Sequence, residues 1–115
     1  MTVTIYHNPR CSKSRQAMEL LRERGIEPEV VEYLKAPPTA EELRRVLAMM
    51  NARPRDIIRK GEAVYRDLGL ADPALSDEQL IEQMIANPIL IERPIVIREG
   101  RAVVGRPPEA ILDII

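Results

Sequence analysis

The chain has 115 residues, 45% of them hydrophobic, which is enough material for one domain over residues 1–115 with a single core. It contains no Phe or Trp and only three Tyr, so we expect a core of Leu, Ile, Val, Met and Ala. A formal net charge of −1 provides no basic field, and few aromatic rings are present for base stacking, so nucleic acid is not expected as a partner.

The chain lacks the sequence features that direct a protein to a membrane. No basic and apolar leader precedes the first apolar stretch, and no apolar run approaches the roughly 20 residues that span a bilayer. We therefore expect a cytoplasmic protein with no membrane partner. The single cysteine, Cys11, cannot form an internal disulfide, so redox chemistry there needs a thiol from another molecule.

The first elements are predicted by apolar periodicity and turn residues. Val3–Tyr6 predicts a short strand, which Asn8-Pro9 ends. A helix is expected from about Ser12 to Arg24, with Gly25 marking its C-terminal end.

A second strand is expected near Glu29–Tyr33, and a helical block follows from Thr39 to Ala86. Capping boxes, in which a Ser or Thr is followed three residues later by Glu or Gln, mark two helix starts in this block. They lie at residues 39–42 and 76–79, and shorter helices are expected around 56–58 and 63–65.

The C-terminal part predicts a hairpin and a helix. Ile95–Ile97 and Ala102–Val104 are rich in β-branched residues, and Glu99-Gly100 joins them as a tight turn. A last helix is expected from residues 106–109 through Ile115, because proline is tolerated in a first helical turn.

The order of these elements matches one α/β architecture. We expect a thioredoxin-like mixed sheet flanked by helices, with a helical insertion between the second and third strands. In such folds the helix after the first strand carries the reactive cysteine, and the proline that begins the third strand is often cis. Pro94 is the candidate here, although an edge-strand proline would give the same pattern.

Cys11 lies where the first strand gives way to the first helix, a position that favours a reactive thiolate. Unpaired amide N–H groups and the positive end of the helix dipole stabilise an anion there. Arg10, Lys13 and Arg15 add positive charge nearby, as does His7 when protonated. Such surroundings lower the pKa of a thiol. The alternative is a buried, inert cysteine, a class in which flanking cations and hydroxyl groups are unusual.

Four separated segments carry a family resemblance. They are Tyr6-His7-Asn8-Pro9-Arg10-Cys11, Ile58-Arg59-Lys60, Asn87–Val96 and Gly105-Arg106-Pro107. They resemble the glutaredoxin-dependent arsenate reductases of the ArsC family, and the resemblance covers essentially the whole chain. The segments Arg10–Arg15 and Gly105–Glu109 are more similar to the chromosomal arsenate-reductase-related branch than to the plasmid resistance enzymes, which leaves the physiological substrate open.

The resemblance implies an oxyanion site that contains Arg59, Arg93 and Arg106. Guanidinium groups present paired donors that match the oxygens of arsenate or a similar oxyanion. These residues are far apart in the sequence, so only the fold can bring them to Cys11. The alternative for each is an ordinary surface charge, although the prolines that follow Arg93 and Arg106 favour a functional role.

The resemblance also implies roles for residues close to Cys11. His7 would help to keep Cys11 as a thiolate, or else be a capping or turn histidine. Ser14 would donate its hydroxyl to the sulfur from the first helical turn, or else be an ordinary serine at a helix N-terminus. Arg15 would support the loop or bind the anion.

The implied activity is the reduction of arsenate to arsenite by attack of the Cys11 thiolate on the arginine-bound oxyanion. Glutathione would act as co-substrate and glutaredoxin would remove it, with no tightly bound cofactor and no metal. Two other classes stay open. One is a small thiol oxidoreductase or anion-binding homologue with another substrate, and the other is a transcription regulator like the Spx proteins. The redox switch of those regulators needs Cys-x-x-Cys, whose second position is Ser14 here.

Overall fold

The computed structural model describes residues 2–115, which form two compact units. One unit combines the chain before residue 37 with Arg93–Ile115 and holds the sheet, and the other, Pro37–Glu92, is helical. The second unit is the helical insertion predicted between the second and third strands. The expectation of one domain stays a prediction, because each unit has its own set of internal contacts.

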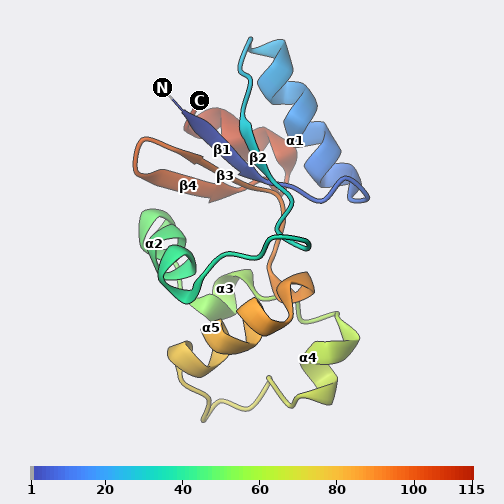
Figure 1. Cartoon of the computed structure of the whole chain (residues 1–115), viewed down its shortest axis with the longest axis vertical. Helices are drawn as coiled ribbons and strands as arrows, with labels where there is room; N and C mark the ends of the chain where they lie inside the picture. The colour runs from blue at the N-terminus through green and yellow to red at the C-terminus, as the bar shows by residue number, and fades with distance from the viewer. Residues whose placement is uncertain (1) are drawn as a thin grey trace. The chain divides into compact units, whose positions relative to one another are not determined.

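Four strands form a mixed sheet in the order β2-β1-β3-β4 (Figure 1). They are β1 (Val3–Tyr6), β2 (Glu29–Val31), β3 (Ile95–Arg98) and β4 (Arg101–Val104). β1 is parallel to β2 and antiparallel to β3, and β3 pairs with β4 as a hairpin. The parallel pair needs a crossover connection, which α1 (Ser12–Glu23) provides. The predicted mixed sheet flanked by helices is confirmed.

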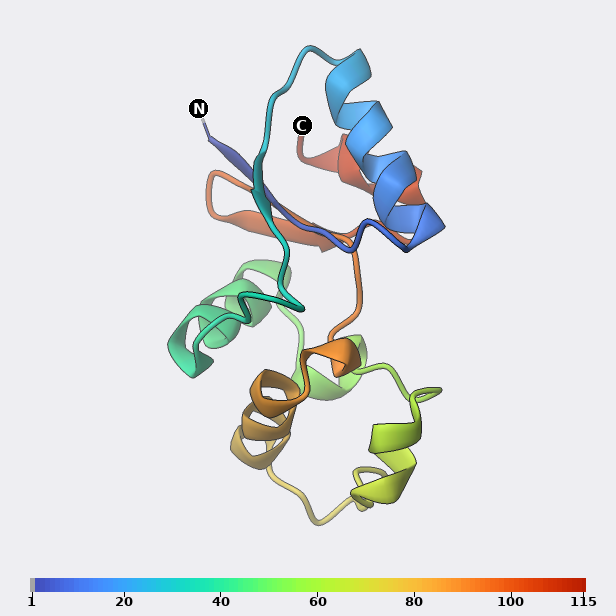
Figure 2. The ribbon, with the colours of Figure 1, turned by 45° about the vertical axis from the view of Figure 1, so that its right-hand side comes forward.

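α1 packs on one face of the sheet because its apolar residues repeat at helical spacing. Its buried residues Ala17, Met18 and Leu21 share one core cluster with strand residues and with Ile111. Ile111 belongs to η2 (Pro108–Asp113), which lies beside α1 (Figure 2). The helix that carries Cys11 at its start is therefore fixed from two sides.

The turns between elements use positive φ angles where the sequence predicts them. Gly25, with a φ of 71°, follows the end of α1. The β3–β4 turn has φ angles of 50° at Glu99 and 76° at Gly100, both positive as a type I′ hairpin requires. Glycine adopts such angles without steric cost.

The C-terminal segment differs from the predicted helix through Ile115. It forms η2 (Pro108–Asp113), a 3-10 helix in which the Ala110 N–H donates to the Pro107 carbonyl at 2.9 Å. The segment spans only 6 residues, a length for which the tighter 3-10 form is common.

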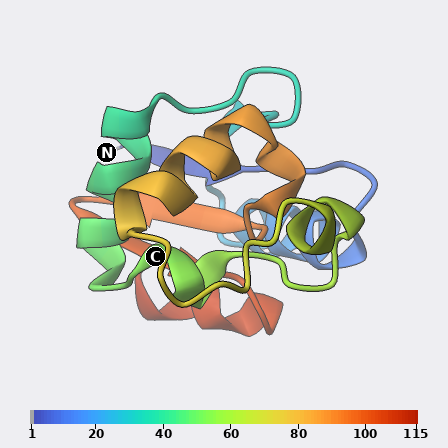
Figure 3. The ribbon, with the colours of Figure 1, turned by 90° about the horizontal axis from the view of Figure 1, so that it is seen from below.

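Pro37–Glu92 contains α2 (Ala40–Met50), α3 (Pro54–Ile57), α4 (Ala63–Asp67), α5 (Asp77–Ala86) and the 3-10 helix η1 (Pro88–Leu90). α5 packs against α2 and α3 (Figure 3). Both arms of the predicted capping box are present at Ser76. At Thr39 the Glu42 carboxylate accepts from the hydroxyl instead of the backbone N–H, so only one arm forms. None of the helices in the described part of the chain is long and apolar enough to cross a membrane.

All three tyrosines are buried, so the prediction of a purely aliphatic core is wrong. Tyr6, Tyr33 and Tyr65 are 5%, 0% and 8% exposed. The rings of Tyr6 and Tyr33 stack, with centroids 6.4 Å apart and an interplanar angle of 23°. Composition limits the number of aromatic rings but does not say where they lie, and each ring buries a large apolar area.

Gly105 lies where a side chain would collide with the core. An added Cβ would be 2.8 Å from Pro94 Cγ and 3.2 Å from Ile111 Cγ2. We predict that Gly105→Ala lowers the free energy of unfolding, measured by urea denaturation, by about 1–3 kcal/mol, the usual cost of overpacking. At Gly61 an added Cβ meets no atom within 4 Å, so the control Gly61→Ala should change stability by at most about 0.5 kcal/mol. Equal effects of the two substitutions would contradict the packing argument.

Candidate active site

Cys11 lies at the N-terminus of α1, as predicted. It is the N-cap residue, its N–H donates to the Asn8 carbonyl at 3.0 Å, and its carbonyl accepts from the Arg15 N–H at 3.0 Å. The backbone N–H groups of Lys13 and Ser14 lie in the first turn of α1 and favour the thiolate form of the Cys11 sulfur. Cys11 keeps 9% of its surface exposed. The first turn of the helix therefore directs its otherwise unpaired donors at the sulfur.

Two arginines from the C-terminal part of the chain meet at Cys11. Arg106 donates from Nη2 to the Cys11 sulfur at 3.5 Å and from Nε to the Arg93 carbonyl at 2.8 Å. The positive charge of the Arg93 guanidinium also favours the thiolate form of the sulfur. Its Nε and Nη1 are buried and, within residues 2–115, have no hydrogen-bond partner. Buried donors without partners are costly, so this edge of Arg93 suits the oxygens of an anion.

Each of these arginines is joined to the proline that follows it by a cis peptide bond. Pro94, the residue that the sequence offers as a candidate for a cis bond, has one. The cis bond at Pro107 was not predicted. The two segments are adjacent because the Gly105 N–H donates to the Pro94 carbonyl at 2.8 Å.

These surroundings lower the pKa of the Cys11 thiol from its ordinary value. Burial by itself would raise the pKa, but the backbone N–H groups of Ser14 and Lys13 and the guanidinium of Arg93 outweigh it. The thiolate is the nucleophilic form of cysteine. More nucleophile is therefore present at neutral pH than in an ordinary thiol.

The Ser14 hydroxyl has partners other than the sulfur. Its Oγ lies 2.6 Å from His7 Nδ1 and accepts the Asn8 N–H at 3.0 Å. Ser14 is fully buried, and its contact with Cys11 is made by its backbone N–H. The hydroxyl thus fixes the turn between β1 and α1, while the backbone stabilises the thiolate.

The pKa of His7 lies below its ordinary value. Burial is the largest cause, Glu32 opposes it, and Arg22 and Arg15 lower the pKa further. The ring is therefore neutral at neutral pH, and its Nδ1 can accept a hydrogen bond that the Ser14 hydroxyl donates. His7 supplies no positive charge to Cys11 in this state, and its connection to the site runs through Ser14.

The other two arginines named by the resemblance have different surroundings. Arg15 donates from Nη1 to the Pro9 carbonyl at 3.0 Å, so it supports the loop before α1. Arg59 belongs to the helical unit, where Nη1 donates to Glu92 at 2.9 Å and Nε lies 3.8 Å from the Glu62 carboxylate. These carboxylates balance the charge of Arg59 inside its own unit. Its role in binding an oxyanion stays a prediction.

The described residues around Cys11 suit an anion. The donors directed at the sulfur are backbone amides and guanidinium groups, both of which bind oxyanions. Across residues 2–115, no three His, Cys, Asp or Glu side chains lie close enough together to hold a metal ion. A tetrahedral oxyanion beside the sulfur would be held by charge-assisted hydrogen bonds.

Comparison with known proteins places the chain in a family, because residues 6–114 match the ArsC family. The chain belongs to the ArsC family. It is 52% identical to the uncharacterized protein YfgD of Escherichia coli, over 98% of this chain and 96% of that one. It is 47% identical to an arsenate reductase of Rhizobium meliloti, over 100% of this chain and 82% of that one. The solved structure of an arsenate reductase from Vibrio cholerae matches with a TM-score of 0.97 at 46% identity, over 100% of this chain and 98% of that one.

Sequence reasoning missed the part that Asn8 plays in this ArsC-family site. Its side chain is buried, and Oδ1 accepts the Arg10 N–H at 3.0 Å, while its carbonyl accepts the Cys11 N–H. The Asn-Pro pair predicted only the end of a strand. The tendency of Asn to bond the backbone two residues on could have indicated this contact.

We predict that Arg93→Ala raises the pKa of Cys11 toward its ordinary value. The substitution removes a charge and a hydrogen bond that favour the thiolate, so the neutral thiol is populated to a higher pH. Thiolate absorbance at about 240 nm, followed across a pH series, measures the change. Arg101→Ala, at an exposed position on β4, is the control and should leave the pKa of Cys11 unchanged. If Arg93→Ala and the unsubstituted protein had the same Cys11 pKa, Arg93 would not stabilise the thiolate.

Proposed function

We propose that this protein reduces arsenate to arsenite, with glutathione and glutaredoxin as the source of electrons. The observation that carries the proposal is the 3.5 Å contact between Arg106 Nη2 and the Cys11 sulfur, next to the buried donors of Arg93. A nucleophile and an anion-binding group are thus adjacent. This is the arrangement that attack on a bound oxyanion requires.

The choice of arsenate is supported by relatives. The proteins of Rhizobium meliloti and Vibrio cholerae are named arsenate reductases, and each match extends over the whole of this chain. The chemistry at Cys11 is compatible with that substrate, since arsenate is a tetrahedral oxyanion and arginine forks match its oxygens.

In the first proposed step the Cys11 thiolate attacks arsenic. An S–As bond forms and one As–O bond breaks, and the departing oxygen leaves as water after taking up protons from solvent. Arsenic stays as arsenic(V). Arg93 and Arg106 stabilise the negative oxygens of the adduct through charge-assisted hydrogen bonds, while the N-terminus of α1 stabilises the thiolate before attack.

In the second step glutathione supplies two electrons. Its thiolate attacks the Cys11 sulfur, an S–S bond forms, and the electron pair of the S–As bond moves to arsenic, which leaves as arsenite. A glutaredoxin thiolate then takes the glutathione from the mixed disulfide and restores Cys11. An external thiol is needed because Cys11 is the only cysteine of the chain.

We predict that Cys11→Ser abolishes arsenite formation in an assay with arsenate, glutathione and glutaredoxin. A hydroxyl is close in size to a thiol, but it is not ionised at neutral pH and is a far weaker nucleophile. Circular dichroism and urea denaturation should show that the variant is folded. Arsenite release by folded Cys11→Ser at the rate of the unsubstituted protein would rule out this nucleophile.

We predict that Arg106→Ala lowers kcat/KM for arsenate by about tenfold or more, which corresponds to roughly 1.4 kcal/mol. The substitution removes a charge-assisted contact at the sulfur. Arg106→Lys should rescue activity only in part, because it restores the charge without the fork that reaches both the sulfur and the Arg93 carbonyl. Arg101→Ala, with the same loss of charge, serves as the control. Unchanged kinetics in Arg106→Ala would make Arg106 an ordinary surface residue.

A further inference from the structure

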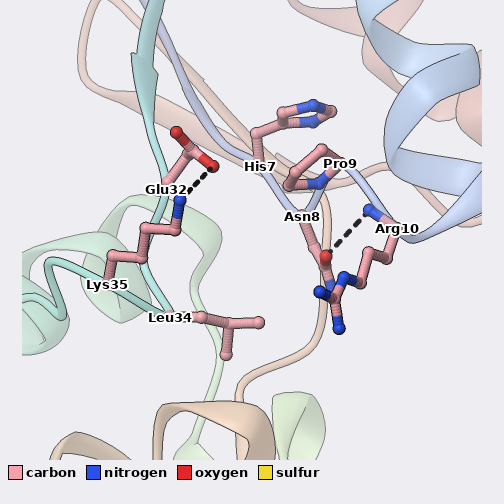
Figure 4. Close-up of a pocket in the computed structure, with 7 residues that line it drawn as sticks. All are labelled: His7, Asn8, Pro9, Arg10, Glu32, Leu34 and Lys35. Atoms are coloured by element: carbon pink, nitrogen blue, oxygen red, sulfur yellow. Dashed lines mark hydrogen bonds and ion pairs between the residues drawn. The ribbon is translucent and has the colours of Figure 1, made fainter.

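A pocket of about 360 Å³ lies beside the loop that precedes α1 (Figure 4). One wall is formed by His7–Arg10, which follow β1, and the other by Glu32, Leu34 and Lys35, which follow β2. The two strands are parallel, and the His7 N–H donates to the Val31 carbonyl at 2.9 Å, so both walls lie at the carboxyl ends of paired strands. Small molecules bind preferentially in crevices at this edge, and sites for them measure roughly 300–1,000 Å³.

The charged side chains of the pocket are two cations and one carboxylate. Arg10 is exposed and, within residues 2–115, takes part in no ion pair. Lys35 Nζ lies 3.9 Å from Glu32 Oε1, with side chains that are 81% and 45% exposed. Such an exposed pair contributes little and is easily exchanged for other partners. His7 adds no charge while its ring is neutral.

Leu34 gives the pocket an apolar surface between these charges. It is 38% exposed, which is unusual for a large hydrophobic residue in this chain. Its side chain points across the pocket toward the wall that holds Asn8 and Arg10 (Figure 4). A ligand with charged ends and an uncharged middle would match this distribution.

We propose that this pocket binds the glutathione that reduces the Cys11 adduct. Glutathione is a small peptide thiol with two carboxylates, one ammonium group and an uncharged backbone between them. Arg10 and Lys35 match the carboxylates, Glu32 matches the ammonium group, and Leu34 contacts the middle. The inference rests on the proposed function, because that function makes glutathione the attacking thiol.

The pocket and the cysteine that the thiol would attack share one turn of the chain. Asn8 lines the pocket, and its carbonyl accepts the Cys11 N–H at 3.0 Å, so one turn carries both a wall of the pocket and the cysteine. Arg93 and Arg106 are not among the residues that line it. The thiol and the oxyanion would therefore depend on different side chains, and their KM values can be changed separately.

S-methylglutathione, whose sulfur cannot react, tests binding directly. Added to nitrogen-15-labelled protein, it should cause saturable shifts in the amide signals of the pocket walls. Lys35→Glu should raise its Kd by about fivefold or more, because attraction at an exposed site becomes repulsion. Arg101→Glu is the matched charge reversal on β4, at the opposite edge of the sheet from β2, and should change Kd by less than about twofold. No saturable shifts at the walls, or equal effects of the two reversals, would overturn the proposal.

Turnover provides a second readout that is specific to the ligand. Lys35→Glu should raise the KM for glutathione by about fivefold, and it should leave unchanged the KM for 2-mercaptoethanol, a thiol with no charged groups. An equal rise in both KM values would overturn the pocket assignment.

The two experiments also separate this proposal from the proposed function. A protein that reduces no arsenate but binds S-methylglutathione through Lys35 would refute the function and retain the pocket. A protein that reduces arsenate with a KM for glutathione unaffected by Lys35→Glu and Arg10→Glu would retain the function and refute the pocket.

Discussion

The hydrogen bond from the Asn8 N–H to the Ser14 hydroxyl, 3.0 Å long, ties the end of β1 to the first turn of α1. The site depends on this contact, because it decides where the helix begins and therefore where its free N–H groups point. The same hydroxyl lies 2.6 Å from His7 Nδ1, so residues on both sides of the turn share one buried oxygen. Burial strengthens such a network and makes the loss of any partner costly.

The sheet brings the arginines to this turn. β1 and β3 are antiparallel with Tyr6 opposite Ile95, so the residues before β3 lie beside the residues after β1. β4 returns along β3 with Ile95 opposite Val104, which brings the segment after β4 to the same place. Strand pairing therefore turns a separation of 95 positions between Cys11 and Arg106 into a contact of 3.5 Å.

Local signals predicted most of the elements, because capping boxes, glycine turns and apolar periodicity act over a few residues. The place of Cys11 at the start of a helix was predictable for the same reason. The hydrogen-bond partners of Ser14 and Arg59 could not be predicted, because only the tertiary structure brings those partners near the hydroxyl and the guanidinium. Arg93 and Arg106 were identified only through a family resemblance. The strand pairing that brings them to Cys11 joins distant parts of the chain, so local sequence patterns do not predict it.

The positive groups that act on Cys11 are amide N–H groups and guanidinium groups, and the imidazole, the side chain that ordinarily titrates near neutral pH, is not among them. His7 could titrate there, but burial keeps it neutral and its Nδ1 faces the Ser14 hydroxyl. The sulfur thus experiences the same electrostatic potential through the neutral range. Its ionisation is a single proton step, unlike a coupled cysteine–histidine pair, in which two macroscopic steps share the charge. Acidification that protonates the nucleophile would leave the arginines and amide groups that surround it unchanged.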